Sequence, residues 1–209
     1  MCFTQGLERT DIRFSTGQLR QCKASVFEGG LRVPGMIHYP DGIKSNINHS
    51  MPVGTVDFLP TIMDLLQVKE SWNPGWILDG MSLVPTFSSD SDPAGSVQQR
   101  RAPDKALGFS WGHNRDGSTG DKTQVGLIDN DLKIMRNPAK GQCDMQPPYD
   151  PASLLNATLL FDLSTDPHEL HDLKEARPEE FRRMSEMLDD FLASINYSQE
   201  HETHCRVKQ

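Results

Sequence analysis

Residues 16–40 of the chain read TGQLRQCKASVFEGGLRVPGMIHYP. This stretch places Lys23, Glu28 and the pair Gly29-Gly30 close together, with a spacing that matches neither a helix nor a strand. Glycine accepts positive φ angles and lets the backbone approach a ligand or another chain segment closely. The pattern therefore predicts a sharp loop that leads into a short buried strand, and loops of this kind often carry binding and catalytic residues.

The segment after the loop has the features of a strand followed by a helix. Residues 33–39 are apolar and are limited by Pro34 and Pro40, which predicts a strand whose proline lies near its start. Asp57 stands where a helix N-cap is expected, and apolar residues recur at helical spacing behind it. We predict a helix over about residues 57–67, with an apolar face for a sheet and a structural role for Asp57.

The second half of the chain alternates short strands with turns and ends in a helix. Strands are predicted at residues 106–111, 123–128, 132–135 and 157–162, with a hairpin turn at Asp129-Asn130. Pro178 opens a long amphipathic helix. Residues 88–101 have almost nothing to bury. The expected organisation is a main-domain block at 1–87, a linker at 88–105, a C-terminal subdomain at 106–197 and a tail at 198–209.

The composition limits the classes of partner. The net charge is -8, with +2 on residues 1–35 and -10 on the rest. An acidic chain disfavours nucleic acid, whereas a small basic region suits an anionic ester. No apolar run approaches the roughly 18 residues that a membrane span needs, and residues 1–6 lack a signal-peptide core.

The cysteines and glycosylation sequons point to the secretory pathway. The four cysteines contain no C-x-x-C pair, so no zinc or redox site is expected. N-x-S/T sequons occur at Asn48, Asn156 and Asn196, which favours a secretory, lysosomal or extracellular route. In that compartment Cys22 and Cys143 are candidates for a disulfide, and four free thiols are the alternative.

Four motifs resemble the sulfatase (arylsulfatase) family. The segment from Lys23 to Pro34 is similar to its G-K-x-x-x-[FY]-E-G-G-x-R-x-P pattern, and residues 57–61 are similar to D-[IL]-x-P-T. Residues 78–83 are similar to [IL]-D-G-x-[SD]-L, and residues 160–169 to L-[YF]-D-L-x-x-D-P-x-E. The order of the motifs implies the C-terminal part of an alkaline-phosphatase-like α/β sulfatase fold, whose small four-stranded antiparallel sheet is covered by a helix.

The resemblance also implies a reaction and its components. Sulfatases hydrolyse sulfuric esters with a formylglycine made within C/S-x-P/A-x-R, and with calcium held by Asp and Asn oxygens. No cysteine of the chain has this signature, and Phe3-Thr4-Gln5-Gly6 stands where an Asp-Asn-Gly metal-binding segment is expected. We therefore expect a chain that starts late, has no metal ligands of its own and is inactive alone.

Lys23 is the expected catalytic and substrate-binding residue. By resemblance its ammonium would hold a sulfate oxygen and stabilise charge on the leaving group. Glu28 and Arg32 are expected to pair and to stabilise the loop around Gly29 and Gly30. His113, at a strand end, is a weaker candidate for the substrate pocket.

Three functions remain open from the sequence. The first is a sulfatase that acts on sulfated sugars or aryl sulfates, and the second is a non-catalytic module that binds anions weakly through Lys23 and Arg20. The third is a phosphodiesterase or phosphonate hydrolase of the same superfamily. The sequence identifies neither the sulfate ester nor the oligomeric state.

Overall fold

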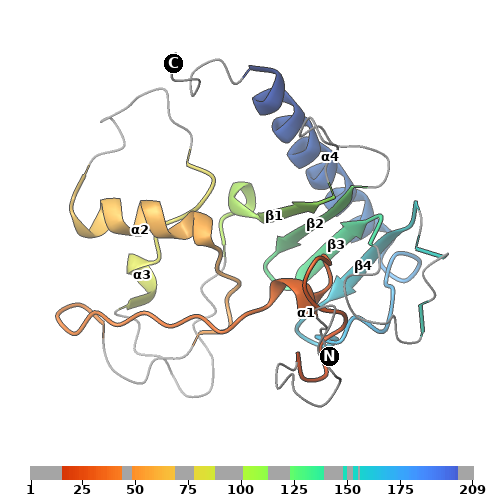
Figure 1. Cartoon of the computed structure of the whole chain (residues 1–209), viewed down its shortest axis with the longest axis horizontal. Helices are drawn as coiled ribbons and strands as arrows, with labels where there is room; N and C mark the ends of the chain where they lie inside the picture. The colour runs from red at the N-terminus through yellow and green to blue at the C-terminus, as the bar shows by residue number, and fades with distance from the viewer. Residues whose placement is uncertain are drawn as a thin grey trace, which may run out of the picture. The chain divides into compact units, whose positions relative to one another are not determined.

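A computed structural model describes residues 16–43, 49–68, 78–87, 101–112, 123–138, 148–149, 153–154 and 156–201. The chain divides into two compact units (Figure 1). Unit 1 comprises Met1–Val33 and Gly108–Gln209, and unit 2 comprises Pro34–Leu107. The sequence-based division placed residues 1–87 in one block, whereas the structure groups the first 33 residues with the C-terminal part. The reason is that buried contacts join Glu28 to Lys133 and Glu169.

Unit 1 is built on an antiparallel sheet with the strand order β1-β2-β3-β4. The strands are β1 Leu107–Trp111, β2 Gln124–Asp129, β3 Leu132–Arg136 and β4 Thr158–Asp162. Asp129 pairs with Leu132 across a two-residue connection in which Asn130 has a φ of 56°. Asparagine tolerates this left-handed conformation, so the four predicted strands and the predicted hairpin turn are confirmed.

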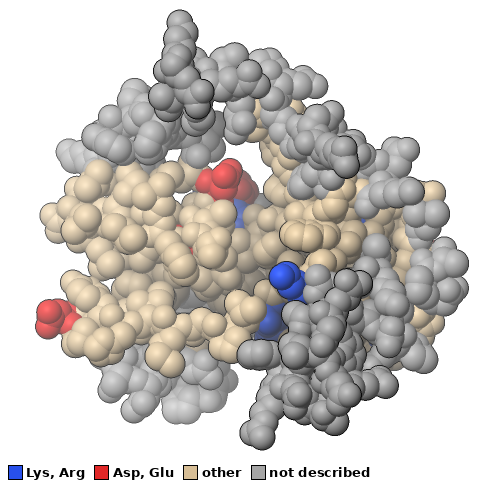
Figure 2. Space-filling model, viewed as in Figure 1, with Lys and Arg blue, Asp and Glu red and all other residues tan. Residues whose placement is uncertain are grey.

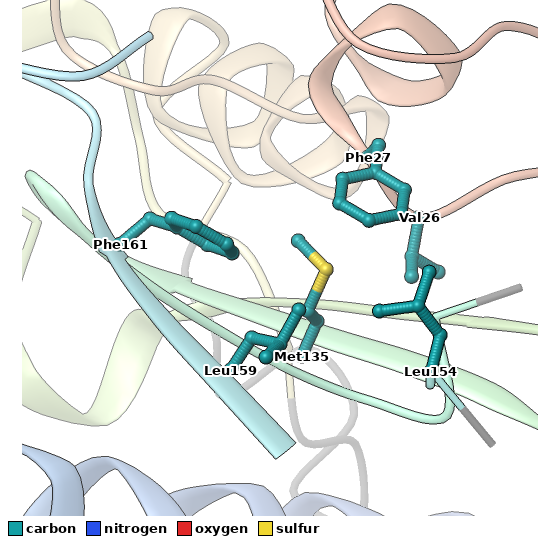
Figure 3. Close-up of a cluster of buried hydrophobic side chains, with 6 residues drawn as sticks. All are labelled: Val26, Phe27, Met135, Leu154, Leu159 and Phe161. Atoms are coloured by element: carbon teal, nitrogen blue, oxygen red, sulfur yellow. The ribbon is translucent and has the colours of Figure 1, made fainter. Parts of the chain in front are cut away.

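The sheet is covered on both faces. Helix α4, Pro178–His201, contacts β2 and β3, and its residues Met184 and Leu188 are completely buried. On the opposite face, Met135 from the sheet packs with Val26 and Phe27 from the N-terminal segment, beside Leu154, Leu159 and Phe161 (Figure 3). The expected long C-terminal helix is therefore present, and the motif segment closes the other side of the sheet.

The motif segment itself forms a one-turn helix, α1, at Glu28–Leu31. Gly29 and Gly30 lie in this helix and neither has a positive φ, so the expected left-handed glycines are not found. Both glycines are needed because other backbone atoms approach them closely. A Cβ on Gly29 would lie 2.1 Å from the Gln21 carbonyl oxygen, and a Cβ on Gly30 would lie 2.1 Å from that of Ser25.

Unit 2 is organised around a buried carboxylate. Its elements are the 3₁₀ turns η1 Thr55–Asp57 and η3 Pro103–Lys105 and the helices α2 Phe58–Leu65 and α3 Val84–Phe87. Asp57 does not cap α2 with its side chain; it accepts the Gly54 and Met81 N–H groups at 2.8 and 2.9 Å and a bidentate pair from Arg101. Asp57 therefore fixes three segments of unit 2, including the end of the predicted linker.

The apolar residues of α2 face outward. The exposed side chains recur along one stripe of the helix, namely Phe58, Leu59, Ile62, Leu65 and Leu66. The surface at the position of α2 is largely uncharged in Figure 2. The strand predicted at residues 33–39 is wrong, because this segment has no regular structure and Met36 is 95% exposed. A strand needs a hydrogen-bonded neighbour, and within the described residues none pairs with this segment.

Candidate functional site

The candidate site is the loop of residues 20–25, here called the lysine loop. Gln21 and Ala24 have φ angles of 60° and 70°, so the backbone turns sharply on both sides of Lys23. Left-handed conformations are costly for residues other than glycine, and they persist only where the surroundings impose them. Lys23 is exposed, and among the described residues its ammonium has no hydrogen-bond or ion-pair partner.

Backbone and side-chain contacts hold both ends of the lysine loop. The Gly29 N–H donates to the Arg20 carbonyl oxygen at 2.8 Å, which fastens the start of the loop to α1. From β2, Gln124 donates to the Ala24 carbonyl oxygen at 3.2 Å and accepts the Val26 N–H at 3.4 Å. The loop is therefore shaped before any ligand arrives, and Lys23 is its exposed cationic group.

Arg20 is not available for an anion, contrary to the expectation for a binding module. Its guanidinium lies 5.8 Å from the ring centre of Phe27 and 5.1 Å from that of Tyr149, and its Nε donates to the His168 carbonyl oxygen at 3.4 Å. Burial lowers the pKa of Arg20, and burial together with the nearby Asp172 carboxylate raises the pKa of Tyr149 to about 12. The arginine therefore packs the loop against the rest of unit 1.

A cysteine next to Lys23 gives the lysine loop a covalent attachment. Cys22 is completely buried and disulfide-bonded. The candidate partner Cys143 lies outside the described residues, so the pairing stays a prediction. His113 and Asn48 also lie outside them. The other two sequon residues, Asn156 and Asn196, are exposed.

Glu28 belongs to a buried ion cluster, defined here as Glu28, Lys133 and Glu169. Lys133 Nζ lies 2.8 Å from Glu28 Oε1 and 2.7 Å from Glu169 Oε1, and Glu169 Oε2 accepts the Glu28 N–H at 2.8 Å. Burial raises the pKa of Glu169, which Lys133 and the Glu28 N–H partly offset. The expected pair between Glu28 and Arg32 is present but longer, at 3.8 Å, with Arg32 half-exposed.

Sequence reasoning did not identify Lys133, Glu169 or Gln124 as parts of this arrangement. A lysine between apolar residues in the middle of a strand was the available signal for Lys133. Glu169 closes the D-P-x-E motif, yet the motif alone does not indicate its partner. Gln124 begins β2 and has no distinguishing neighbour in the sequence.

The histidines near Glu169 have hydrogen-bond or ion-pair partners within unit 1. His168 Nδ1 lies 3.1 Å from the Gln18 carbonyl oxygen, and His171 Nδ1 lies 3.5 Å from Asp166 Oδ2. Over the described part of the chain, no group of three or more His, Cys, Asp and Glu residues is arranged to hold a metal ion. Within those same residues, no helix has the length and apolar character that crossing a membrane requires.

The architecture and comparisons with known proteins define the class of protein to which this fold belongs. No family model matches the chain. Among solved structures, a Bacteroides thetaiotaomicron protein described with the metabolism of multiple glycosaminoglycans aligns with a TM-score of 0.53 and 20% identity, over 84% of this chain and 32% of that one. The antiparallel sheet with its C-terminal helix is therefore part of an alkaline-phosphatase-like fold, as expected.

Among curated proteins, the chain is similar to arylsulfatases. Arylsulfatase K of Danio rerio is 36% identical over 97 residues, which are 46% of this chain and 16% of that protein. Arylsulfatase K of Bos taurus is 32% identical over 176 residues, which are 84% of this chain and 27% of that protein. The chain is therefore related to the sulfatases, resembles their C-terminal portion and spans less than a third of the length of either relative.

Proposed function

We propose that the chain contributes the sulfate-binding lysine of a sulfuric ester hydrolase that acts on sulfated carbohydrates or aryl sulfates. The observation that carries the proposal is the exposed Lys23 ammonium, which has no partner among the described residues, on a loop that is anchored on both sides. An ammonium can direct three donors at a tetrahedral anion. The sulfatase relatives favour a sulfate over a phosphate ester.

In this role Lys23 would bind a sulfate oxygen in the bound ester and remain in contact as the ester bond breaks. Negative charge then grows on the leaving oxygen and the sulfate group, so a fixed cation stabilises the transition state more than the ground state. A contact of this type lowers the activation free energy by about 3 kcal/mol. Because the loop backbone is already held in shape, little of this stabilisation is offset by the entropy cost of ordering the loop on binding.

The nucleophile and calcium would have to come from polypeptide other than the described residues. Calcium takes six to eight oxygen ligands in most protein sites, and the described part of the chain offers no group of three carboxylate or histidine side chains. These residues therefore do not fit the ion. Cys22 is disulfide-bonded and so is not a source of formylglycine.

The 209-residue chain alone is accordingly expected to bind sulfate without hydrolysing an ester. Its sequence contains no C/S-x-P/A-x-R signature around a cysteine, which favours a non-catalytic anion-binding module as the second candidate function. The sequons and the bonded Cys22 support a secretory or lysosomal location. Incubation with 4-nitrophenyl sulfate and calcium should give no turnover, and measurable turnover would overturn this part of the proposal.

The binding role is tested by titrating the chain with sulfate and 4-nitrophenyl sulfate while recording amide and lysine NMR signals. Saturable shifts are expected at Lys23 and Ala24, and they should disappear in Lys23→Gln. Lys174→Gln is the control, because Lys174 is a partly exposed lysine that pairs with Asp172 at 3.4 Å. Equal titration of Lys23→Gln and the unaltered chain would contradict the role of Lys23.

A further inference from the structure

The buried ion cluster has a composition that stability does not explain. Lys133 and Glu169 are completely buried and Glu28 is 4% exposed, so one ammonium faces two carboxylates away from water. Taking such charges out of water is expensive, and apolar side chains of similar volume often give equal or greater stability. Arg32 adds only a distant positive charge, at 3.8 Å from Glu28.

The cluster instead joins three segments that are far apart in the sequence. Lys133 lies in β3 on the same face as Met135, two residues away, which packs against Phe27. Glu169 comes from the turn after β4 and binds the N–H at the first residue of α1. Glu28 is therefore fixed through both its main chain and its side chain, which sets the position of α1 on the sheet.

The position of α1 in turn sets that of the lysine loop. The Gly29 N–H binds the Arg20 carbonyl oxygen at 2.8 Å, and a Cβ on Gly30 would lie 2.8 Å from the Cys22 carbonyl oxygen. There is no free space between α1 and the loop at these points, so a shift of α1 must move the loop backbone. Lys23 lies on that backbone, one residue after Cys22.

We propose that Lys133 and Glu169 are positioning residues for Lys23, which act through Glu28 and α1 without contacting the anion. This inference rests on the proposed sulfate-binding role of Lys23. It gives these three buried polar side chains a role in the geometry of the lysine loop. Replacing the cluster by neutral side chains should keep the fold and lose the geometry of the lysine loop.

The test compares the unaltered chain with the triple variant Glu28→Gln, Lys133→Met and Glu169→Gln. The Gly29 amide proton should exchange with solvent about tenfold faster in the triple variant, and the Kd for sulfate should rise about tenfold, as expected when a binding group is displaced by a fraction of an ångström. The Leu163 N–H, which binds the carbonyl oxygen of Asp131 in the turn between β2 and β3, is the reference amide and should exchange at an unchanged rate. A purely structural role would accelerate both amides together.

Two further variants complete the test. Glu169→Gln alone keeps the pair between Lys133 and Glu28, and provides a folded sample if the triple variant does not fold; it should show the same changes to a smaller extent. Lys174→Met removes a surface ion pair and should change neither quantity. A folded cluster variant with unchanged Gly29 exchange and unchanged sulfate affinity would overturn the proposal.

Failure of the two proposals can be told apart. If the unaltered chain shows no sulfate binding at Lys23, the proposed function fails, and Gly29 exchange still decides whether the cluster positions the loop. If sulfate binds at Lys23 and the cluster variants bind it equally well, only the positioning role fails.

Discussion

Substitution of Gly29 by alanine tests the contact that fixes the lysine loop. The added Cβ would lie 2.1 Å from the Gln21 carbonyl oxygen and 2.4 Å from the Arg20 carbonyl oxygen. Both are backbone atoms, so no side-chain rotation relieves the clash and the loop must move away from α1. Overpacking of this kind costs about 1–3 kcal/mol, and loss of the bond from the Gly29 N–H to the Arg20 carbonyl oxygen adds about 1 kcal/mol.

We therefore expect Gly29→Ala to lower the free energy of unfolding of unit 1 by about 2–4 kcal/mol and to weaken sulfate binding at Lys23. Urea denaturation followed by the near-ultraviolet signal gives the first quantity, and NMR titration gives the second. Gly35→Ala is the matched control, since a Cβ there has no atom within 4 Å and should change the stability by less than about 0.5 kcal/mol. A Gly29→Ala variant as stable as this control would refute the close-packing argument.

Three further outcomes are expected. Arg101→Met should lower the free energy of unfolding by about 3–5 kcal/mol, because it leaves the completely buried Asp57 carboxylate without its bidentate partner. Arg136→Met breaks a partly exposed pair with Asp189 and should lower the free energy of unfolding by less than about 1 kcal/mol in the same denaturation assay. Ala24→Gly should raise the melting temperature, because glycine adopts a φ of 70° without strain and the free energy of unfolding should increase by up to about 1 kcal/mol. A lower melting temperature would contradict the inference that Ala24 is strained. Burial alone would raise the pKa of Asp57, but hydrogen bonds from Arg101 and two backbone N–H groups lower this pKa below its usual value. The stabilisation from Asp57 should therefore be fully present above the ordinary aspartate pKa and should be lost as the pH falls through the lowered pKa. When the free energy of unfolding is measured against pH, this loss should be absent in Asp57→Asn.

The sheet of unit 1 follows from local sequence features. Each strand has an apolar period with turn residues at its ends, and Asn130 supplies the left-handed residue that the hairpin needs. Helix α4 begins at Pro178, where the missing N–H costs nothing, and places its apolar side chains against β2 and β3. These features act over a few residues and are visible in the sequence alone.

The parts that sequence reasoning missed depend on contacts across long distances. The segment 33–39 has the composition of a strand, but composition does not supply the neighbour that a strand requires. Gly29 and Gly30 suggested a positive φ, whereas their role is to admit carbonyl oxygens from the lysine loop. Lys133 has its partners in α1 and in the turn after β4, and no local pattern indicates either one.

Sequence reasoning proposed one residue and its loop as the candidate site. Lys23 was singled out by its motif, and the structure shows it exposed beside a disulfide-bonded Cys22. Its role in binding sulfate remains a prediction. Arg20 was expected to assist in anion binding, but it is buried and its guanidinium packs beside the rings of Phe27 and Tyr149.

The long-range anchoring of α1 has a consequence for the order in which the protein matures. Lys133 follows Glu28 by 105 residues, and Glu169 follows it by 141. During synthesis the lysine loop leaves the ribosome before the sheet of unit 1 and cannot dock until β4 and the turn after it have emerged. Closing such long loops is slow, so the lysine loop is expected to be among the last regions of unit 1 to become ordered. A stalled or shortened chain that ends before Glu169 would therefore leave the lysine loop unfolded and open to proteolysis.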